Sequence, residues 1–327
     1  MSEDYAKPTS QVDRSRHLAT LHEGWVTPLS AVADVIGETT TAPVLDICRI
    51  VAGEGNEVYD VTLEGASSLI VRISHRGPES HDREAWVLGQ CDSLGIQAPR
   101  VHLHKHLEVG SDRRSVIVME KLAGERLCDL DPDEVDLPGV LGGVGAWLRR
   151  LHSIPVHGFG YLDGSGGGKH ATMEGWLAGF GLEARVFEDA GRSVGLEAAT
   201  IRGWVAEIVD SFRAVPPRIT LIHNDLLADH VLVHDGQLSG VIDFGEIAAE
   251  PAVSEFAKWD FNEGDRLPVK WIQDGYGDPS LFQPPNDRTY RALWFATGLW
   301  HMAYYHDTGF LPGVEAARDR LLTASRR

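Results

Sequence analysis

The first 120 residues alternate between apolar and polar positions in a way that is typical of β-strands. Alternation bounded by glycine-bearing turns predicts strands at residues 44–51, 57–63, 67–73, 100–107 and 115–120. Apolar side chains at helical spacing predict a short amphipathic helix at 27–36 and a second helix at 78–94, with Pro78 in its first turn. The pattern therefore predicts a small, mostly antiparallel sheet accompanied by helix.

After Gly124 the apolar residues recur at helical intervals. This spacing predicts helices at 137–152, 176–187 and 196–212, and again from Ser254 onward. The only clear β content in this half is a hairpin within 221–246 that turns at Asp235-Gly236, while GSGGGK at 164–169 is expected to be a surface loop. We therefore expect an α+β chain of two lobes. The β-rich N-terminal lobe would span residues 1–121, of which about the first 15 are loose, and the helical C-terminal lobe would span residues 122–327.

Composition narrows the class of protein. The chain has 327 residues, 43% hydrophobic and 24% charged, which fits a folded protein of about two domains. A formal charge of −18 argues against non-specific binding to nucleic acid or anionic membranes and permits a cationic substrate, although acidity also simply promotes solubility. Cys48, Cys91 and Cys128 lack the spacing of a zinc or disulfide framework. Neither a signal peptide nor a membrane-length apolar run is present, so we expect a cytoplasmic protein.

The segment LIHNDLLADHVLVHDGQLSGVIDFGE, residues 221–246, combines an H-x-D loop, a tight hairpin and an I-D-F-G run. This layout is typical of a phosphoryl-transfer site, in which Asp225 would accept a hydroxyl proton and Asp243 would hold Mg²⁺. Where protein kinases have a metal-binding Asn, this chain has His230. Two roles are open for His230: a metal ligand as a neutral imidazole, or an anchor of the loop. The alternative for the whole segment is an ordinary hairpin after a polar loop.

The segment resembles the aminoglycoside phosphotransferase family, and its H-x-D-x-x-x-x-H form is most similar to the macrolide-kinase branch. Residues 148–163, LRRLHSIPVHGFGYLD, add to the resemblance, and His152 within them is expected to be a packing residue. The resemblance implies a protein-kinase-like fold with a small antiparallel β-sheet N-lobe and a large, mainly helical C-lobe. It also implies Mg²⁺ and a nucleoside triphosphate as phosphoryl donor.

Residues for the nucleotide are expected in the first lobe. A glycine-bearing loop contains Gly53, Gly55 and Asn56, and its backbone N–H groups would approach phosphate. The third glycine of the phosphate-binding motif G-x-G-x-x-G is missing, so a plain hairpin turn is the alternative. Arg72 occupies the strand position where protein kinases place a phosphate-binding Lys, unless it simply faces solvent. Glu84 is its expected ion-pair partner, with Asp82 and Glu79 as competitors.

The resemblance places the hinge between the lobes at 116–127. Met119 would form an apolar wall behind the base, and the Glu120 carbonyl and Leu122 amide would contact its edge. Because backbone groups would read the base, the choice between ATP and GTP stays open.

Acceptor residues are expected after the hairpin, where carboxylates and aromatic residues accumulate, with a solvated helix face as the alternative. The candidates are Glu246, Glu255, Trp259, Asp260 and Glu263. The aromatic run at 290–306 is expected to pack in the core, unless an apolar substrate such as a macrolide uses part of it.

The expected function is transfer of a γ-phosphoryl group from ATP or GTP to a hydroxyl of an antibiotic-like, sugar-bearing compound, for resistance or self-protection. The alternatives are a choline, homoserine or sugar kinase and a non-catalytic, pseudokinase-like nucleotide-binding module. Retention of both Asp225 and Asp243 argues against the binding module. A protein kinase is disfavoured because no A-P-E segment follows Asp243. No nucleic-acid or membrane partner is expected, and the oligomeric state stays open.

Overall fold

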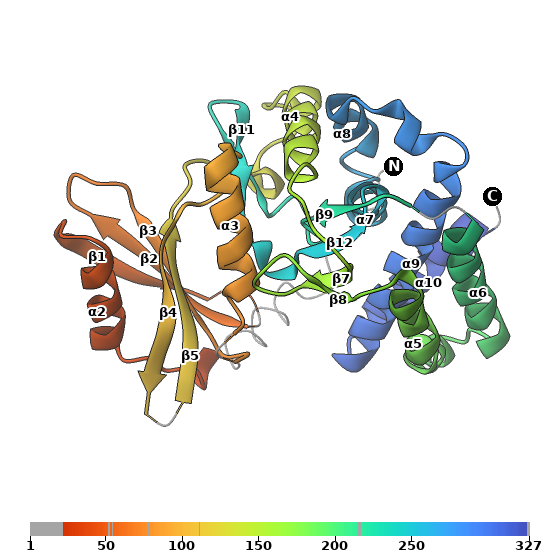
Figure 1. Ribbon diagram of the computed structural model, residues 1–327, viewed down its shortest axis with the longest axis horizontal. Coiled ribbons are helices and arrows are strands. Elements are labelled where there is room, and N and C mark those ends of the chain that lie inside the picture. Colours follow the sequence, from red (N-terminus) through yellow and green to blue (C-terminus); the bar gives the residue numbers. More distant parts are fainter. Residues whose placement is uncertain are drawn as a thin grey trace. The chain divides into compact units, whose positions relative to one another are not determined.

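The computed structural model describes residues 22–325 except 52, 54, 78, 111, 215 and 216, and the chain forms two compact units (Figure 1). The first unit comprises Met1–Gly124 and Ser239–Gly245, and the second comprises Glu125–Leu238 and Glu246–Arg327. About the first 15 residues, which were expected to be loose, lie outside the described part of the chain. Among the described residues, no helix has the length and apolar character needed to cross a membrane.

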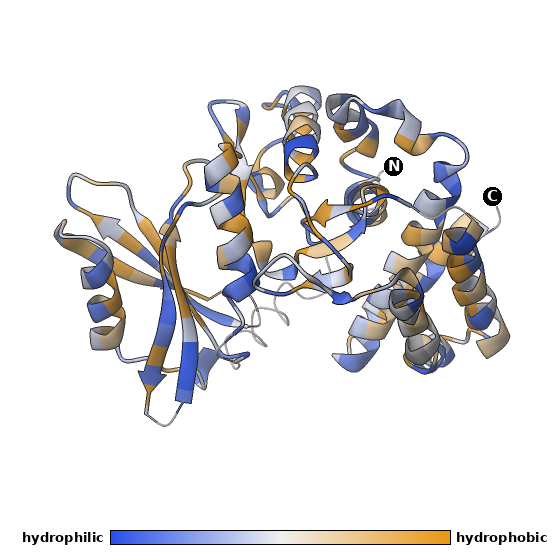
Figure 2. Ribbon diagram, viewed as in Figure 1, coloured by the Kyte–Doolittle hydropathy of each residue, from blue (hydrophilic) through white to orange (hydrophobic). Residues whose placement is uncertain are grey.

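The first unit is built on a five-stranded antiparallel sheet in the order β1-β2-β3-β5-β4. Its strands are β1 Val44–Ile50, β2 Asn56–Leu63, β3 Leu69–Ser74, β4 Val101–Val109 and β5 Asp112–Glu120. Side chains of β2 and β3 alternate between buried and partly exposed. Figure 2 colours the same strands by hydropathy and shows both apolar and polar residues along them. Helix α2, Leu29–Thr39, packs Val32, Val35 and Ile36 against the buried face. The predicted small antiparallel sheet is confirmed.

The second helix of this unit, α3, spans Asp82–Leu94, so the predicted start at Pro78 was wrong. Gly77 has φ 128°, and its carbonyl accepts a hydrogen bond from the Ser80 amide, so this segment turns before the helix begins. Asp82 and Glu84 lie in the first helical turn, where the helix dipole favours negative charge.

The second unit is mainly helical, as predicted. Its helices are α4 Leu137–Leu151, α5 Met173–Ser193, α6 Ala198–Ala214, α7 Val253–Glu263, α8 Val269–Tyr276, α9 Asn286–Asp307 and α10 Leu311–Ser325. Asp136 and Thr172 cap α4 and α5 by accepting backbone N–H groups, which explains where these helices begin. Helices α5, α6, α9 and α10 share one apolar core that includes Phe212, Leu299 and Leu321.

The hairpin is not the only β-structure of the second half, so that prediction was wrong. Besides β10 Val231–His234 and β11 Gln237–Val241, the structure has β6 Glu125–Arg126, β7 Phe159–Leu162, β8 Gly168–His170, β9 Ile219–Ile222 and β12 Ala248–Pro251. The missed strands have two to four residues, too few to show a periodic pattern. The predicted loop at 164–169 accordingly runs into β8 at Gly168.

A four-stranded sheet has the order β8-β7-β12-β9. Its strand β9 leads directly into the H-x-D loop. Three short 3-10 helices complete the elements: η1 Leu127–Asp129, η2 Phe244–Glu246 and η3 Pro279–Phe282. The predicted two-residue turn between β10 and β11 is confirmed, because Asp235 and Gly236 have φ angles of 49° and 73°. Positive φ at both positions is the geometry of a tight hairpin turn.

Candidate functional site

Arg72 of β3 lies between two carboxylates of the first unit. Its Nη1 donates to Glu84 Oε1 at 2.6 Å, and its Nη2 donates to Asp243 Oδ1 at 3.1 Å. The Arg72 side chain is 14% exposed, so it does not simply face solvent. Of the expected partners, Glu84 makes the ion pair, whereas Asp82 contacts His104 instead. The sheet and α3 therefore hold one cation beside the Asp243 carboxylate.

Burial and the neighbouring charges shift the pKa values of Glu84 and Arg72. Burial raises the pKa of Glu84 and the charge of Asp243 raises it further, while Arg72 and the Phe244 amide act in the opposite direction. Burial alone would lower the pKa of Arg72, but the charges of Glu84 and Asp243 outweigh it and raise this pKa above its ordinary value. Arg72 therefore stays cationic.

Asp243 and Asn224 have left-handed backbones, with φ angles of 67° and 73°. Among the described residues, the only other non-glycine residue of this kind is Asp235, in the hairpin turn. Side chains with a Cβ rarely adopt such angles, and functional loops are where they concentrate. The two unusual conformations thus occur at the I-D-F-G segment and immediately before Asp225.

The start of β2 is tied to Arg72 through a polar network. With the Asn56 amide oriented so that its oxygen faces Arg72, that oxygen accepts from Nη2 at 2.8 Å and the nitrogen donates to His81 Nε2. His81 Nδ1 also contacts Ser115 Oγ at 3.1 Å. Burial, and then the charge of Arg72, lower the pKa of His81 to about 3, so this histidine is neutral. A Cβ at position 55 would lie 2.5 Å from Arg76 Nε, so any residue other than glycine there would require the flexible Arg76 side chain to move.

Glu57 forms a second buried cluster of the first unit, which the sequence analysis missed. It accepts hydrogen bonds from Tyr59 Oη at 2.6 Å, His75 Nε2 at 2.7 Å and Thr27 Oγ1 at 2.8 Å. These bonds outweigh the burial that would raise the pKa of Glu57, and its pKa lies below the ordinary value. One signal was available: Glu57 shares the strand face of Tyr59 and Val61, both buried. The cluster fastens the segment before α2 to the strand that follows the glycine loop.

The expected hinge residues lie at the end of β5. Met119 is buried, with 5% of its surface exposed, and the Glu120 amide donates to the Arg100 carbonyl at 2.8 Å. Leu122 packs against Gly240, where an added Cβ would come within 2.7 Å of Leu122 Cδ1. A side chain at position 240 would therefore require the Leu122 side chain to move.

In the second unit, a buried carboxylate holds the backbone of the H-x-D loop. Glu255, in the first turn of α7 and 1% exposed, accepts the amides of His223 at 2.6 Å and Asn224 at 2.9 Å. Burial raises the pKa of Glu255 to about 7, although Lys258 and the two amides act against this shift. Lys258 also donates to Asn224 Oδ1 and to Glu250. The loop before Asp225 is thus fixed by side chains from α7.

Asp225 and His230 are joined within this loop. The nitrogen His230 Nδ1 lies 2.7 Å from the Asp225 carbonyl oxygen and must donate to it, because a carbonyl only accepts. A neutral His230 then carries its lone pair on Nε2. The Asp225 side chain is 40% exposed and that of His230 is 14% exposed. This geometry suits either role expected for His230, metal ligand or loop anchor.

The five expected acceptor residues differ in burial and in the partners that they contact. Trp259 is fully buried and donates from Nε1 to the Leu267 carbonyl at 2.9 Å, a placement that does not suit contact with an acceptor. Glu255 is likewise enclosed and engaged with the loop, so its side chain does not face an acceptor either. Glu263 accepts the Ala228 amide at 3.2 Å.

Asp260 and Glu246 remain partly exposed. Burial raises the pKa of Asp260, while a hydrogen bond with Tyr290 counteracts the shift. The Glu246 carbonyl accepts from Asn224 Nδ2 at 2.8 Å.

The aromatic residues at 290–306 differ in exposure: Phe295 is buried, whereas Trp300 and Tyr304 are exposed by 45% and 49%.

Sequence reasoning overlooked the roles of Lys258, His81 and Glu57. Nothing in the sequence marks Lys258 as a partner of Asn224, because the two residues are 34 positions apart. His81 precedes α3 and resembles a surface residue of a polar turn. Only Glu57 left a signal, in the strand alternation described above.

A profile of the phosphotransferase enzyme family matches residues 46–279. Comparison with curated proteins finds no match. Among solved structures, aminoglycoside phosphotransferase APH(4)-Ia is similar with a TM-score of 0.70 and 19% identity, covering 91% of this chain and 98% of that one.

Two further solved structures share the fold. A GDP complex of an aminoglycoside 2'-phosphotransferase-IIIa mutant has a TM-score of 0.65 and 14% identity, over 92% of this chain and 98% of that one. Macrolide 2'-phosphotransferase MphH from Brachybacterium faecium has a TM-score of 0.58 and 16% identity, over 88% and 96%. At identities below 20%, these solved structures support the fold alone. The match to the family profile covers most of the chain and therefore supports membership of the family. The chain therefore belongs to the phosphotransferase enzyme family and is a kinase.

Proposed function

We propose that this kinase transfers the γ-phosphoryl group of ATP or GTP to a hydroxyl of an antibiotic-like, sugar-bearing small molecule, as a resistance or self-protection step. The observation that carries the proposal is the brace on the H-x-D loop, where Glu255 holds two backbone amides while the Asp225 side chain stays 40% exposed. Phosphoryl transfer depends mainly on positioning, and its base takes the hydroxyl proton late. We assign that role to Asp225.

The nucleotide phosphates are assigned to the first unit. Arg72, held by Glu84, supplies a permanent cation that can bind phosphate through its forked N–H groups. Asn56 contributes by orienting Arg72, and Gly53 and Gly55 contribute backbone N–H groups that phosphate oxygens can approach closely.

The base of the nucleotide is assigned to the end of β5. Met119 forms an apolar wall, and the Glu120 carbonyl and Leu122 amide contact the base edge. Both purines remain in the proposal, because APH(4)-Ia is known in complex with AMP-PNP and the 2'-phosphotransferase-IIIa mutant with GDP.

The donor set fits Mg²⁺. Asp243 offers a carboxylate, the ligand that hard Mg²⁺ prefers, and its side chain is 41% exposed. His230 offers Nε2 as a second, softer ligand. We propose Asp243 as the main protein ligand and His230 as the second. When bound, Mg²⁺ neutralises charge on the phosphate oxygens.

The acceptor class rests on the relatives and on charge. APH(4)-Ia is known in complex with hygromycin B and APH(2")-IIa with streptomycin, both at no more than 20% identity to this chain. The formal charge of −18 suits a cationic aminoglycoside. Glu246, Asp260 and Glu263 remain the candidate acceptor residues, because Glu255 and Trp259 are enclosed.

A substrate panel tests the proposal. Aminoglycosides, macrolides, nucleoside antibiotics, choline, homoserine and simple sugars are incubated with Mg²⁺ and ATP or GTP, and mass spectrometry detects the added phosphate. We expect an antibiotic to be phosphorylated, and Asp225→Asn to abolish the product. Phosphorylation of the small metabolites alone would replace the proposal with a metabolite kinase. Nucleotide binding without any product would favour a binding module.

A further inference from the structure

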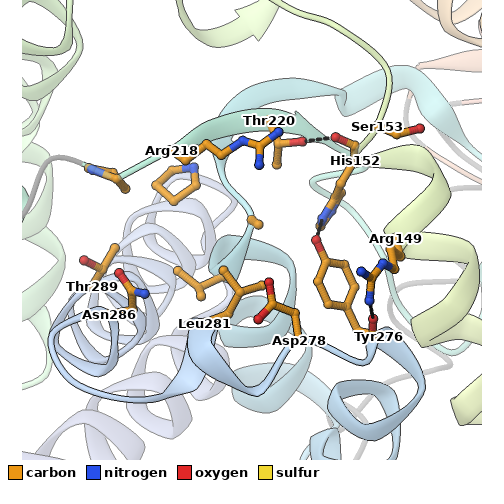
Figure 3. Close-up of a pocket in the computed structure, with 14 residues that line it drawn as sticks. Arg149, His152, Ser153, Arg218, Thr220, Tyr276, Asp278, Leu281, Asn286 and Thr289 are labelled. Carbon is orange, nitrogen blue, oxygen red and sulfur yellow. Dashed lines mark hydrogen bonds between the residues drawn. The ribbon is translucent and has the colours of Figure 1, made fainter.

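A cavity of about 320 Å³ lies in the second unit among the end of α4, the start of β9, the start of α7, η3 and the start of α9 (Figure 3). Its lining includes Arg149, His152, Arg218, Asp278 and Thr289. These residues are separate from those proposed to bind nucleotide, metal or acceptor. A volume of this order is at the small end of ligand-binding pockets.

Two buried polar side-chain atoms of this lining have no hydrogen-bond partner within the described residues. They are His152 Nε2 and Thr289 Oγ1. His152 is 8% exposed and Thr289 is 1% exposed. Leaving a buried polar group without a partner is energetically unfavourable, so such groups normally face a ligand or water. Two of them around one cavity indicate a site built for a polar occupant.

The His152 ring is fixed in its orientation by its neighbours. Its Nδ1 lies 3.1 Å from Tyr276 Oη, and its backbone carbonyl accepts from Thr220 Oγ1 at 2.6 Å. Figure 3 shows both contacts at the edge of the cavity. Burial lowers the pKa of His152 to about 3, so the ring is neutral and its Nε2 exchanges hydrogen bonds rather than charge.

The charged groups of the lining favour an anion. The lining contains two guanidinium groups, Arg149 and Arg218, and one carboxylate, Asp278. Arg149 donates from Nη1 to the carbonyls of Tyr276 and Gly277 at 2.9 and 3.2 Å, which leaves its other N–H groups for a ligand. Asp278 is engaged through Oδ1 with the Ser280 amide and hydroxyl. In a chain of formal charge −18, a lining with a cationic excess is a local exception.

We propose that this cavity binds a small hydroxylated molecule that carries one carboxylate or phosphate group. Arg149 and Arg218 hold the anionic group, and His152 Nε2 and the Thr289 hydroxyl bind the hydroxyl groups of the ligand. Apolar side chains such as Leu281 and Val253 limit the occupant to a compact molecule.

The cavity wall is continuous with the H-x-D loop. Thr220 lines the cavity at one end of β9, and His223 follows the other end of this strand. Val253 lines it at the start of α7, and Glu255, two residues later, holds the loop amides. A ligand that orders these two segments is expected to slow local opening of the loop.

The test uses the full-length protein saturated with Mg²⁺ and AMP-PNP, so that oxyanions do not compete for the nucleotide site. Glycerate and glycerol phosphate are the anionic probes, and glycerol is the uncharged control. Calorimetry measures binding, and amide hydrogen exchange of the peptide at 219–226 reports on the loop. We expect both anions to bind at least 10-fold more tightly than glycerol and to increase protection of this peptide. The stronger of the two probes identifies carboxylate or phosphate as the preferred group.

Thr289→Val is the diagnostic variant, and Thr297→Val is its matched control on the same helix. Thr297 is also buried, but its hydroxyl already donates to the Leu293 carbonyl at 2.9 Å. We expect Thr289→Val to weaken probe binding at least 10-fold without lowering the melting temperature, because it removes a hydroxyl that has no protein partner. Thr297→Val should bind the probes like the parent protein. The proposal is overturned if neither anion binds, if glycerol binds equally well, or if Thr289→Val binds unchanged, because the cavity then holds solvent only.

Discussion

Asp225 combines an exposed carboxylate with a fixed backbone. The residue before it has a left-handed φ of 73°, and that residue's amide is held by Glu255 at 2.9 Å. Such local strain is maintained only where surrounding contacts impose it. The side chain that follows is therefore presented in a defined direction, as a positioned base requires.

Asp225→Asn removes the proton acceptor while it preserves the shape of the side chain. We expect kcat to fall by roughly 10² or more, with nucleotide affinity and melting temperature nearly unchanged. Steady-state kinetics with the acceptor identified by the panel, together with nucleotide calorimetry, measure these effects. Near-normal turnover in this variant would remove Asp225 from the mechanism.

His230 donates from Nδ1 to the Asp225 carbonyl, and this bond serves both of its proposed roles. If Nε2 also binds Mg²⁺, His230→Asn should retain substantial activity, because an amide oxygen can replace the imidazole as a ligand. His230→Ala should then require several-fold more Mg²⁺ for half-maximal activity. A titration of activity against Mg²⁺ distinguishes the roles: an unchanged Mg²⁺ requirement with a lowered melting temperature would make His230 a loop anchor only.

At the scale of elements, β3 and α3 are connected through the Arg72–Glu84 ion pair, with N···O at 2.6 Å. Arg72→Ala leaves the buried Glu84 carboxylate without its cation, so we expect both a lower melting temperature and a higher KM for the nucleotide. Arg72→Lys keeps the charge without the fork and should retain part of the activity. Thermal melts and nucleotide kinetics on both variants test this. Wild-type kinetics in Arg72→Ala would show that the pair has only a structural role.

Helix α7 controls the H-x-D loop through Glu255, whose pKa is raised to about 7 by burial. The ionised form accepts both loop amides, whereas protonation turns one carboxyl oxygen into a donor that faces them less favourably. We expect kcat to fall as pH drops through about 7. Glu255→Gln should have low kcat at all pH values and no such transition. A pH profile of kcat in which the parent and the variant show the same transition would exclude Glu255 as its source.

The length of an element decides whether it can be predicted from the sequence pattern. The strands of the first unit have six to nine residues, long enough for alternation to appear, and they were predicted. The strands around the H-x-D loop are shorter and depend on pairing partners that are distant in sequence, such as β12 with β9. Helix α7 is buried on nearly every side, so its residue types did not reveal that Glu255 and Trp259 point inward.

For the whole molecule, the order of motifs specified the family, whereas the supporting contacts required the structure. Asp225, Asp243 and Arg72 were proposed as site residues from the motifs that contain them and from the family resemblance. Glu84, the partner of Arg72, was also expected, whereas the supports of the H-x-D loop, Glu255 and Lys258, lie more than 30 positions from the loop they hold. Sequence periodicity reports local burial and carries no information on such long-range hydrogen bonds.

Buried histidines and the buried carboxylates of Glu84 and Glu255 affect acid stability in opposite directions. Burial lowers the pKa of His81 and His152 to about 3 and that of His301 to about 4, all below the usual value of 6.5. At pH values between the folded-state pKa of each histidine and about 6.5, the unfolded chain binds more protons than the folded chain. Each histidine therefore lowers the free energy of unfolding by about 1.4 kcal/mol per pH unit as pH falls below about 6.5. The raised pKa values of Glu84 and Glu255 have the opposite effect, because the folded chain binds more protons above pH 4.5.

This opposition predicts an acid-unfolding curve with two parts. Between about pH 6.5 and 4.5, Glu255 offsets part of the loss caused by the histidines and Glu84 acts in the same direction, so the free energy of unfolding should decrease less steeply there. Below pH 4.5 that offset ends and Glu57, whose pKa is lowered, begins to lose its stabilising charge, so the decrease should become steeper. Urea unfolding at half-unit pH steps measures the curve. Glu255→Gln removes one offsetting group and should steepen the upper part, and a curve that is equally steep in both parts, with no effect of this variant, would contradict the assignment.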